Sequence, residues 1–96
     1  MSELNAMPMH WYVVKVRQGR ERWIARAIAW EFSRHDLADQ FGQILVVDKY
    51  PGYLLVNMAG SDQAMRLVEE TEYVVGLRQA VPLEPKEVVR IVGGRD

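Results

Sequence analysis

The chain has 96 residues, enough for one small domain and no more. Its net charge of −1 argues against a protein that wraps nucleic acid by bulk electrostatic attraction. The absence of cysteine excludes a disulfide framework and a thiolate metal site, and it favours a cytoplasmic location. No apolar run approaches the roughly 20 residues of a membrane helix, and the first ten residues do not resemble a signal peptide.

The first half of the chain predicts a strand, a helix and a second strand. We expect residues 1–9 to form a flexible lead-in, and HWYVVKV at 10–16, rich in aromatic and β-branched residues, predicts a strand. In the helix predicted over 20–37, Ile24, Ile28 and Phe32 recur at the spacing of one helix face and predict its buried stripe. GQILVVD at 42–48 predicts the second strand.

The second half starts with a tight turn. Pro51 and Gly52 suit the central positions of a type II turn, where glycine supplies the positive φ. The elements expected after it are a strand over 53–58, a helix over 62–71 with Ser61 as its N-cap, a strand over 73–77, and a short terminal helix within 82–92 that begins at Pro85. Residues 93–96 are expected to begin a linker or to be a cut end.

The order of these elements predicts an α+β domain over residues 10–92. Strand-helix-strand-strand-helix-strand is typical of the ferredoxin-like split βαβ fold, a four-stranded antiparallel sheet with two helices on one face. A short C-terminal helix would follow. In the third strand, alternation directs Leu54, Val56 and Met58 towards the helices and Tyr53, Leu55 and Asn57 to the other face. The first strand is expected to add Trp11, Val13 and Lys15 to that second face.

The second face of the predicted sheet carries an apolar patch. Its members would be Trp11, Val13, Tyr50, Tyr53 and Leu55. Exposed apolar patches usually mark partner surfaces, and aromatic residues dominate binding energy there. The alternative is that the terminal helix or residues 1–9 fold over this face and make it part of the core.

Several stretches, taken in order, resemble the N-terminal domain of NusG-type transcription elongation factors. They are WYVVKVRQGRE, FGQILV, YPGYLLVNM, LVEETEYVVGL and PLEPKEVVRI. The aromatic-Pro-Gly-Tyr sequence before an apolar strand is the most distinctive, and Leu77 stands where the family commonly has an aromatic residue. The likeness extends over about residues 10–92. Any one of the motifs is weak, but the ordered set is fairly specific.

The resemblance implies a non-enzymatic domain without a cofactor. Family members bind the clamp helices of the largest RNA polymerase subunit through an aromatic-apolar patch, reach towards the second-largest subunit, and promote processive elongation or modulate termination. The residues that match the patch are Trp11, Tyr50, Tyr53, Leu55, Val75 and Leu77; those that match the second-subunit contact are Ala64, Met65 and Arg66; and those that would face DNA are Lys15, Arg17, Arg20 and Arg22.

The chain departs from the bacterial family pattern in two ways. Most bacterial members have a longer, basic insertion before the Tyr-Pro-Gly-Tyr motif, whereas only VDKYPGY stands here, as in the archaeal type of domain. We therefore expect weak or no direct DNA contact, and a solvated helix start is the simpler interpretation of the basic cluster. The sequence also ends without the usual KOW domain, so the partners that KOW recruits cannot be inferred.

Trp23 and Trp30 form a second apolar stripe on the first helix. They are seven residues apart, share one side of the helix, and have Ala27 between them. A helix packed on one sheet does not need this second stripe. It predicts contact with a dimer mate or another domain, unless the terminal helix or the lead-in covers it.

Two other classes of protein remain possible on this sequence. GYLLVNM faintly resembles the central strand of a single-stranded RNA-binding module, although Leu55 occupies the place of a base-stacking aromatic. A small ferredoxin-like dimeric enzyme ranks last, because no acid-base pair or nucleophile motif is present. His10 and His35 lack metal-ligand spacing, so we expect no metal site.

Overall fold

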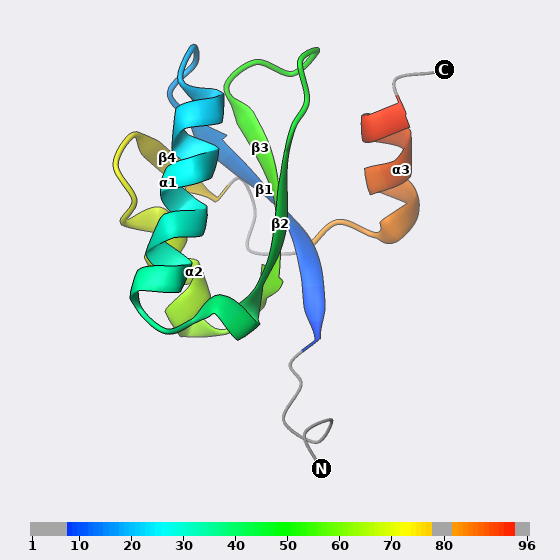
Figure 1. The fold of residues 1–96 in the computed structure, drawn as a ribbon. Coiled ribbons are helices and arrows are strands. Elements are labelled where there is room, and N and C mark those ends of the chain that lie inside the picture. Colours follow the sequence, from blue (N-terminus) through cyan, green and yellow to red (C-terminus); the bar gives the residue numbers. More distant parts are fainter. Residues whose placement is uncertain (1–7, 78–81, 94–96) are drawn as a thin grey trace.

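The computed structural model describes residues 8–77 and 82–93 and confirms the predicted fold. The elements are β1 (Met9–Val16), α1 (Glu21–Arg34), the 3₁₀ turn η2 (Ala38–Gln40), β2 (Phe41–Val46), β3 (Tyr53–Ala59), α2 (Asp62–Glu69), β4 (Val74–Leu77) and α3 (Pro85–Gly93). The strands form one antiparallel sheet in the order β2-β3-β1-β4 (Figure 1). The expected lead-in and linker fall almost entirely outside the described residues.

The main core lies between the sheet and the helices α1 and α2. The predicted stripe of α1, Ile24, Ile28 and Phe32, is completely buried. Val14 and Val56 from the two central strands meet it, and the Phe32 ring lies 5.0 Å from that of Phe41 at the start of β2. Full burial of each such aliphatic or aromatic side chain contributes roughly 1.5–3 kcal/mol, so this layer supplies most of the stability of a small domain.

Helix α1 ends three residues before its predicted end. Asp36 adopts a φ of 60°, in the left-handed region, and the N–H of Leu37 donates to the carbonyl of Phe32 at 2.8 Å. A left-handed residue just past the last turn is a common helix stop, and aspartate tolerates it better than most residues. The apolar pattern extends to Leu37 because that side chain still packs against the core after the helix has ended.

Ser61 caps α2 as predicted. Its hydroxyl oxygen accepts a hydrogen bond from the N–H of Ala64 at 3.1 Å and donates to Oε1 of Gln40 at 2.6 Å. Gln40 is only 8% exposed, so its amide depends on this partner. One hydroxyl thus both starts α2 and satisfies a buried amide beside β2.

The second face of the sheet is partly covered by α3. Figure 1 shows α3, in red and orange, on the opposite side of the sheet from α1 and α2. The segment just before α3 is attached to β1 by a β-bridge between Trp11 and Leu83, in which the Leu83 N–H donates to the Trp11 carbonyl at 2.7 Å. Val88 is buried and Ile91 half-buried, whereas Val89 is 70% exposed. The alternative of a terminal helix on this face is therefore correct in part.

A carboxylate joins the start of α1 to the turn between β2 and β3. Glu21 accepts hydrogen bonds from the N–H of Gly52 at 2.6 Å and from the N–H of Gly19 at 3.0 Å. Gly52 has the predicted positive φ, at 87°, and its carbonyl accepts from the N–H of Val16 at 2.9 Å. The pKa of Glu21 is lowered below its ordinary value of 4.5. The largest cause is the hydrogen bond from the Gly52 N–H, and the next is the hydrogen bond from the backbone N–H of Glu21 itself.

We predict that Ser61→Ala lowers the free energy of unfolding by about 1–2 kcal/mol, because it removes the cap of α2 and leaves the buried Gln40 amide without its partner. Urea denaturation measures the loss. Ser33→Ala is the matched control, since Ser33 lies exposed on α1. Equal costs for the two substitutions would contradict this role of Ser61.

The lowered pKa of Glu21 predicts a pH dependence of stability. Because the folded state binds this proton less readily than the unfolded state, Glu21 stabilises the fold above pH 4.5, and the contribution is lost as the pH falls below that value. Denaturant unfolding between neutral and acidic pH should therefore give a shallower decline for Glu21→Gln than for the unmodified chain. Parallel declines would show that Glu21 titrates alike in both states.

Candidate functional site

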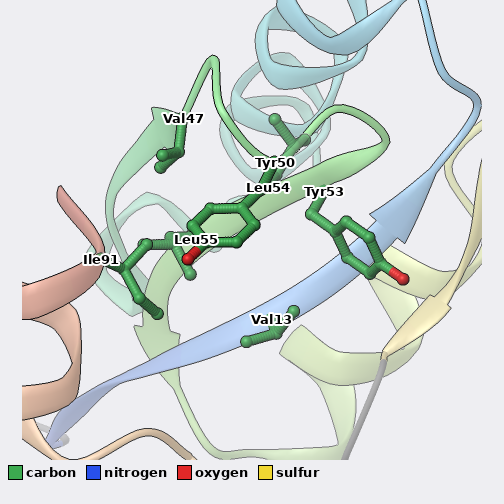
Figure 2. A pocket seen from close by; sticks show the side chains of 7 residues that line it. All are labelled: Val13, Val47, Tyr50, Tyr53, Leu54, Leu55 and Ile91. Atoms are coloured by element: carbon green, nitrogen blue, oxygen red, sulfur yellow. The ribbon is translucent and has the colours of Figure 1, made fainter. Parts of the chain in front are cut away.

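The tip of the β2–β3 hairpin and the second face of the sheet form an apolar hollow of about 390 Å³. Its lining residues are Val13, Val47, Tyr50, Tyr53, Leu54, Leu55 and Ile91. Figure 2 shows the Tyr50 ring lying over β3 with its hydroxyl turned towards Ile91, while the Tyr53 ring points the other way, away from Ile91. The hollow is therefore bounded by the hairpin tip on one side and by α3 on the other.

The exposure of these residues separates a floor from a rim. Leu55 is only 4% exposed, although it lies on the opposite face of the sheet from the main core. Tyr53 is half-buried, and Tyr50 is 45% exposed. Leu55 is thus the floor of the hollow, and the two tyrosines, together with Ile91, form its walls. The predicted patch is present, but α3 narrows it.

Strand register confirms which residues share this face. β1 and β3 pair Trp11 with Asn57, Val13 with Leu55, and Lys15 with Tyr53. Directly opposed residues project to the same side of a sheet, so Trp11, Val13 and Lys15 lie on the face of the hollow, as predicted. Trp11, which forms the β-bridge with Leu83, is half-buried and does not line the hollow.

The structure corrects the placement of Leu77. It pairs with Val14 and packs against the main core, so it lies on the helix side of the sheet. A register shift explains this, because Lys15 pairs with Gly76 while Val16 pairs with Val74, which makes Val75 the extra residue of a bulge. Val75 is 67% exposed and does not line the hollow.

The start of α2 offers less surface than the resemblance implies. Ala64 is completely buried, because it lies on the inner face of α2 against the core. Met65 is half-buried and Arg66 is exposed. Of these three residues, only Met65 and Arg66 present side-chain surface to a partner.

The four basic residues near α1 do not gather at one place. The guanidinium groups of Arg17 and Arg20 lie 5.5 and 5.3 Å from the centre of the Tyr73 ring, which is cation–π geometry. Arg22 lies 3.7 Å from Asp48 in an exposed ion pair, and Lys15 is on the face of the hollow beside Tyr53. Only Arg17 and Arg20 converge, and the ring on which they meet, Tyr73, is more than fifty residues later in the sequence, so no local motif marks it.

Trp23 and Trp30 form an exposed aromatic face on the outer side of α1. Trp23 is 46% exposed and Trp30 is 63% exposed. Trp23 meets Tyr73 edge to face at 5.5 Å, and a shallow hollow between α1 and the end of α2 includes both tryptophans and Ala27. The suggestion that the terminal helix covers this stripe is wrong, since α3 lies on the other side of the sheet (Figure 1).

The described residues contain no group of three or more histidine, cysteine or acidic side chains placed to hold a metal ion. His35 instead lies 3.3 Å from Glu31, one helical turn away. Among the same residues, no helix is long and apolar enough to cross a membrane. In residues 8–77 and 82–93, two apolar surfaces suggest function: the hollow, and the α1 tryptophan face formed by Trp23, Ala27 and Trp30.

The sequence matches a family model described as "Transcription termination factor nusG" over residues 9–92. The "Transcription termination/antitermination protein NusG" of Neisseria meningitidis is 36% identical over 87 residues, which cover 73% of this chain and 49% of that protein. The Escherichia coli K12 protein of the same name is 28% identical over an alignment 114 residues long, which covers 96% of this chain and 62% of that protein. The chain thus spans about half to three fifths of the length of these relatives.

Solved structures agree with this match. NusG of Thermotoga maritima superposes with a TM-score of 0.79 at 25% identity, covering 95% of this chain and 61% of that one. The N-terminal domain of NusG from Methanocaldococcus jannaschii superposes with a TM-score of 0.69 at 22% identity and shares the fold over 84% of this chain and 98% of that domain. Because the family model matches residues 9–92, most of the sequence, the chain belongs to the NusG family of transcription termination and antitermination proteins.

Proposed function

We propose that the chain binds RNA polymerase by docking the hollow at Tyr50, Tyr53 and Leu55 onto the clamp helices of the largest subunit. The observation that carries this proposal is an apolar hollow with a buried floor and an exposed tyrosine on its wall. Such a site accepts an apolar side chain from a partner at little cost in conformational entropy, because its own rings are already placed. Family membership supports the choice of partner.

The edge of the hollow is basic. The ammonium group of Lys49 lies 5.6 Å from the centre of the Tyr50 ring, and Lys15 is directly opposite Tyr53 in the sheet. A partner helix with an apolar side chain at its tip and carboxylates around it would fit this arrangement best. The charges would steer the encounter and fix the orientation, while the apolar contact would supply most of the affinity.

Bound in this way, the chain acts by binding rather than by catalysis, favours processive elongation or alters termination, and works in the cytoplasm. Met65 and Arg66 would face the second-largest subunit. Arg17 and Arg20 are the pair that would lie nearest to DNA, with weak or no direct contact. We do not retain the RNA-binding alternative, because Leu55, which occupies the position of a stacking aromatic on the central strand, is buried beneath the hollow.

We also propose that two copies pair through the α1 tryptophan face. A two-fold axis between Arg26 and Ala27 would set each Trp23 against Trp30 of the second copy, with the small Ala27 allowing close approach. Glu31 at the Trp30 end is already paired with Arg34 at 3.0 Å, so the match of Trp23 with Trp30, and not charge, sets the antiparallel direction.

We predict that Tyr53→Ala weakens binding to the isolated clamp-helix segment by at least about tenfold, because it removes one wall of the hollow from a contact that a few aromatic side chains dominate. Isothermal titration calorimetry measures the affinity, and circular dichroism confirms that the variant is folded. Trp30→Ala serves as control, since it removes an exposed ring from the other side of the molecule. Unchanged affinity in Tyr53→Ala would reject this assignment of the site.

The same two variants test the pairing of two copies through α1, with Trp30→Ala now the test and Tyr53→Ala the control. In sedimentation velocity experiments at increasing concentration, the unmodified chain and Tyr53→Ala should form a dimer. Trp30→Ala should remain monomeric, because each Trp23 loses the Trp30 ring that it would meet on the second copy. A monomer throughout the series for the unmodified chain would rule out the homodimer.

A further inference from the structure

We propose that Glu21 is a positioning residue for the docking surface: its carboxylate holds the Pro51-Gly52 turn against the start of α1 and thereby sets the directions of Tyr50 and Tyr53. This inference rests on the proposed function, because it assumes that these two rings meet the partner. Glu21 itself lies outside the lining of the hollow and would make no contact with that partner.

The two carboxylate oxygens of Glu21 hold two different loops. Oε1 accepts from the N–H of Gly19, two residues earlier, and Oε2 accepts from the N–H of Gly52, 31 residues later in the chain. The bond to Gly52, at 2.6 Å, is short for an N–H donor, as expected when the acceptor is charged. Charged acceptors make hydrogen bonds roughly twice as strong as neutral ones.

Gly52 is held on both sides of its backbone. Its N–H donates to Glu21, and its carbonyl accepts from the N–H of Val16 in β1 at 2.9 Å. The residue is buried and has a positive φ, so the chain bends here in a conformation that few other residues would adopt. Because Tyr53 follows directly and Tyr50 lies two residues before, fixing this one residue fixes where both rings leave the backbone.

The other contacts of the hairpin tip are weaker. The N–H of Tyr50 donates to the Val47 carbonyl, which stays within the tip itself. Arg22 and Asp48 are 3.7 Å apart, and both side chains are largely exposed, so that ion pair adds little. Within the described part of the chain, the carboxylate of Glu21 makes the one side-chain hydrogen bond to residues 47–53.

A glutamine at this position would keep the shape but not the chemistry. A carboxylate offers acceptors on both oxygens, whereas an amide offers one acceptor oxygen and an NH₂ group that only donates. Glu21→Gln therefore satisfies either Gly19 or Gly52 but not both. We expect the tip to sample more conformations, so that ordering it on binding would cost affinity.

The experiment compares Glu21→Gln with Glu31→Gln, a matched control on the same helix whose carboxylate pairs with Arg34 and His35 away from the turn. Affinity for the clamp-helix segment is measured by calorimetry at a temperature where all variants are fully folded. We expect Glu21→Gln to bind about tenfold more weakly and Glu31→Gln to bind like the unmodified chain. Equal affinity of Glu21→Gln and the unmodified chain would overturn the positioning role.

A second measurement does not depend on the partner. The exchange rate of the Gly52 amide hydrogen, measured by NMR, should rise in Glu21→Gln well beyond any rise at Val56, a completely buried residue of β3 that pairs with both β1 and β2 and would change only if the whole fold were loosened. An unchanged Gly52 rate would overturn the inference by itself. If the unmodified chain does not bind the segment at all, the proposed function fails, and the exchange rates still decide whether Glu21 holds the turn.

Discussion

Strand β3, one of the two central strands, carries apolar side chains on both faces of the sheet, and the rest of the structure depends on how each face is covered. Val56 on one face is completely buried by the helices, while Leu55 on the other is covered by α3 and two tyrosine rings. On the face of Val56, the helices α1 and α2 complete a closed core. On the face of Leu55, an open hollow remains, because α3 covers this face mainly through Val88 and Ile91. An apolar face covered in this incomplete way is suited to a partner.

The hollow is useful only if its walls keep their places, and hairpin tips are usually among the more mobile parts of a domain. Here the tip is attached to the rigid start of α1 through Glu21 and to β1 through Val16. The same carboxylate also closes the loop that leads into α1, through Gly19. Two of the stretches that resemble the family, WYVVKVRQGRE and YPGYLLVNM, thus meet in one structural unit.

Local patterns predicted the elements, the buried stripe of α1, the cap at Ser61 and the glycine turn, since each depends on residues close in sequence. Local patterns did not predict the features that depend on residues far apart in the sequence. The bulge at Val75 reverses the face of Leu77, and no periodicity marks it. Tyr73 adopts a φ of 71°, in the left-handed region, and lies near two arginines that precede it by more than fifty residues. Alternation placed Leu55 on the second face, but its burial depends on α3.

We propose that the partner binds the second face of the sheet at the tip of the β2–β3 hairpin. The most direct test is an amide chemical-shift map of the chain, recorded while the clamp-helix segment is added. We predict that the perturbed amides are those of the residues that line the hollow: Val13, Val47, Tyr50, Tyr53, Leu54, Leu55 and Ile91. Perturbations centred on Trp23 and Trp30, with the hollow unchanged, would contradict the claim.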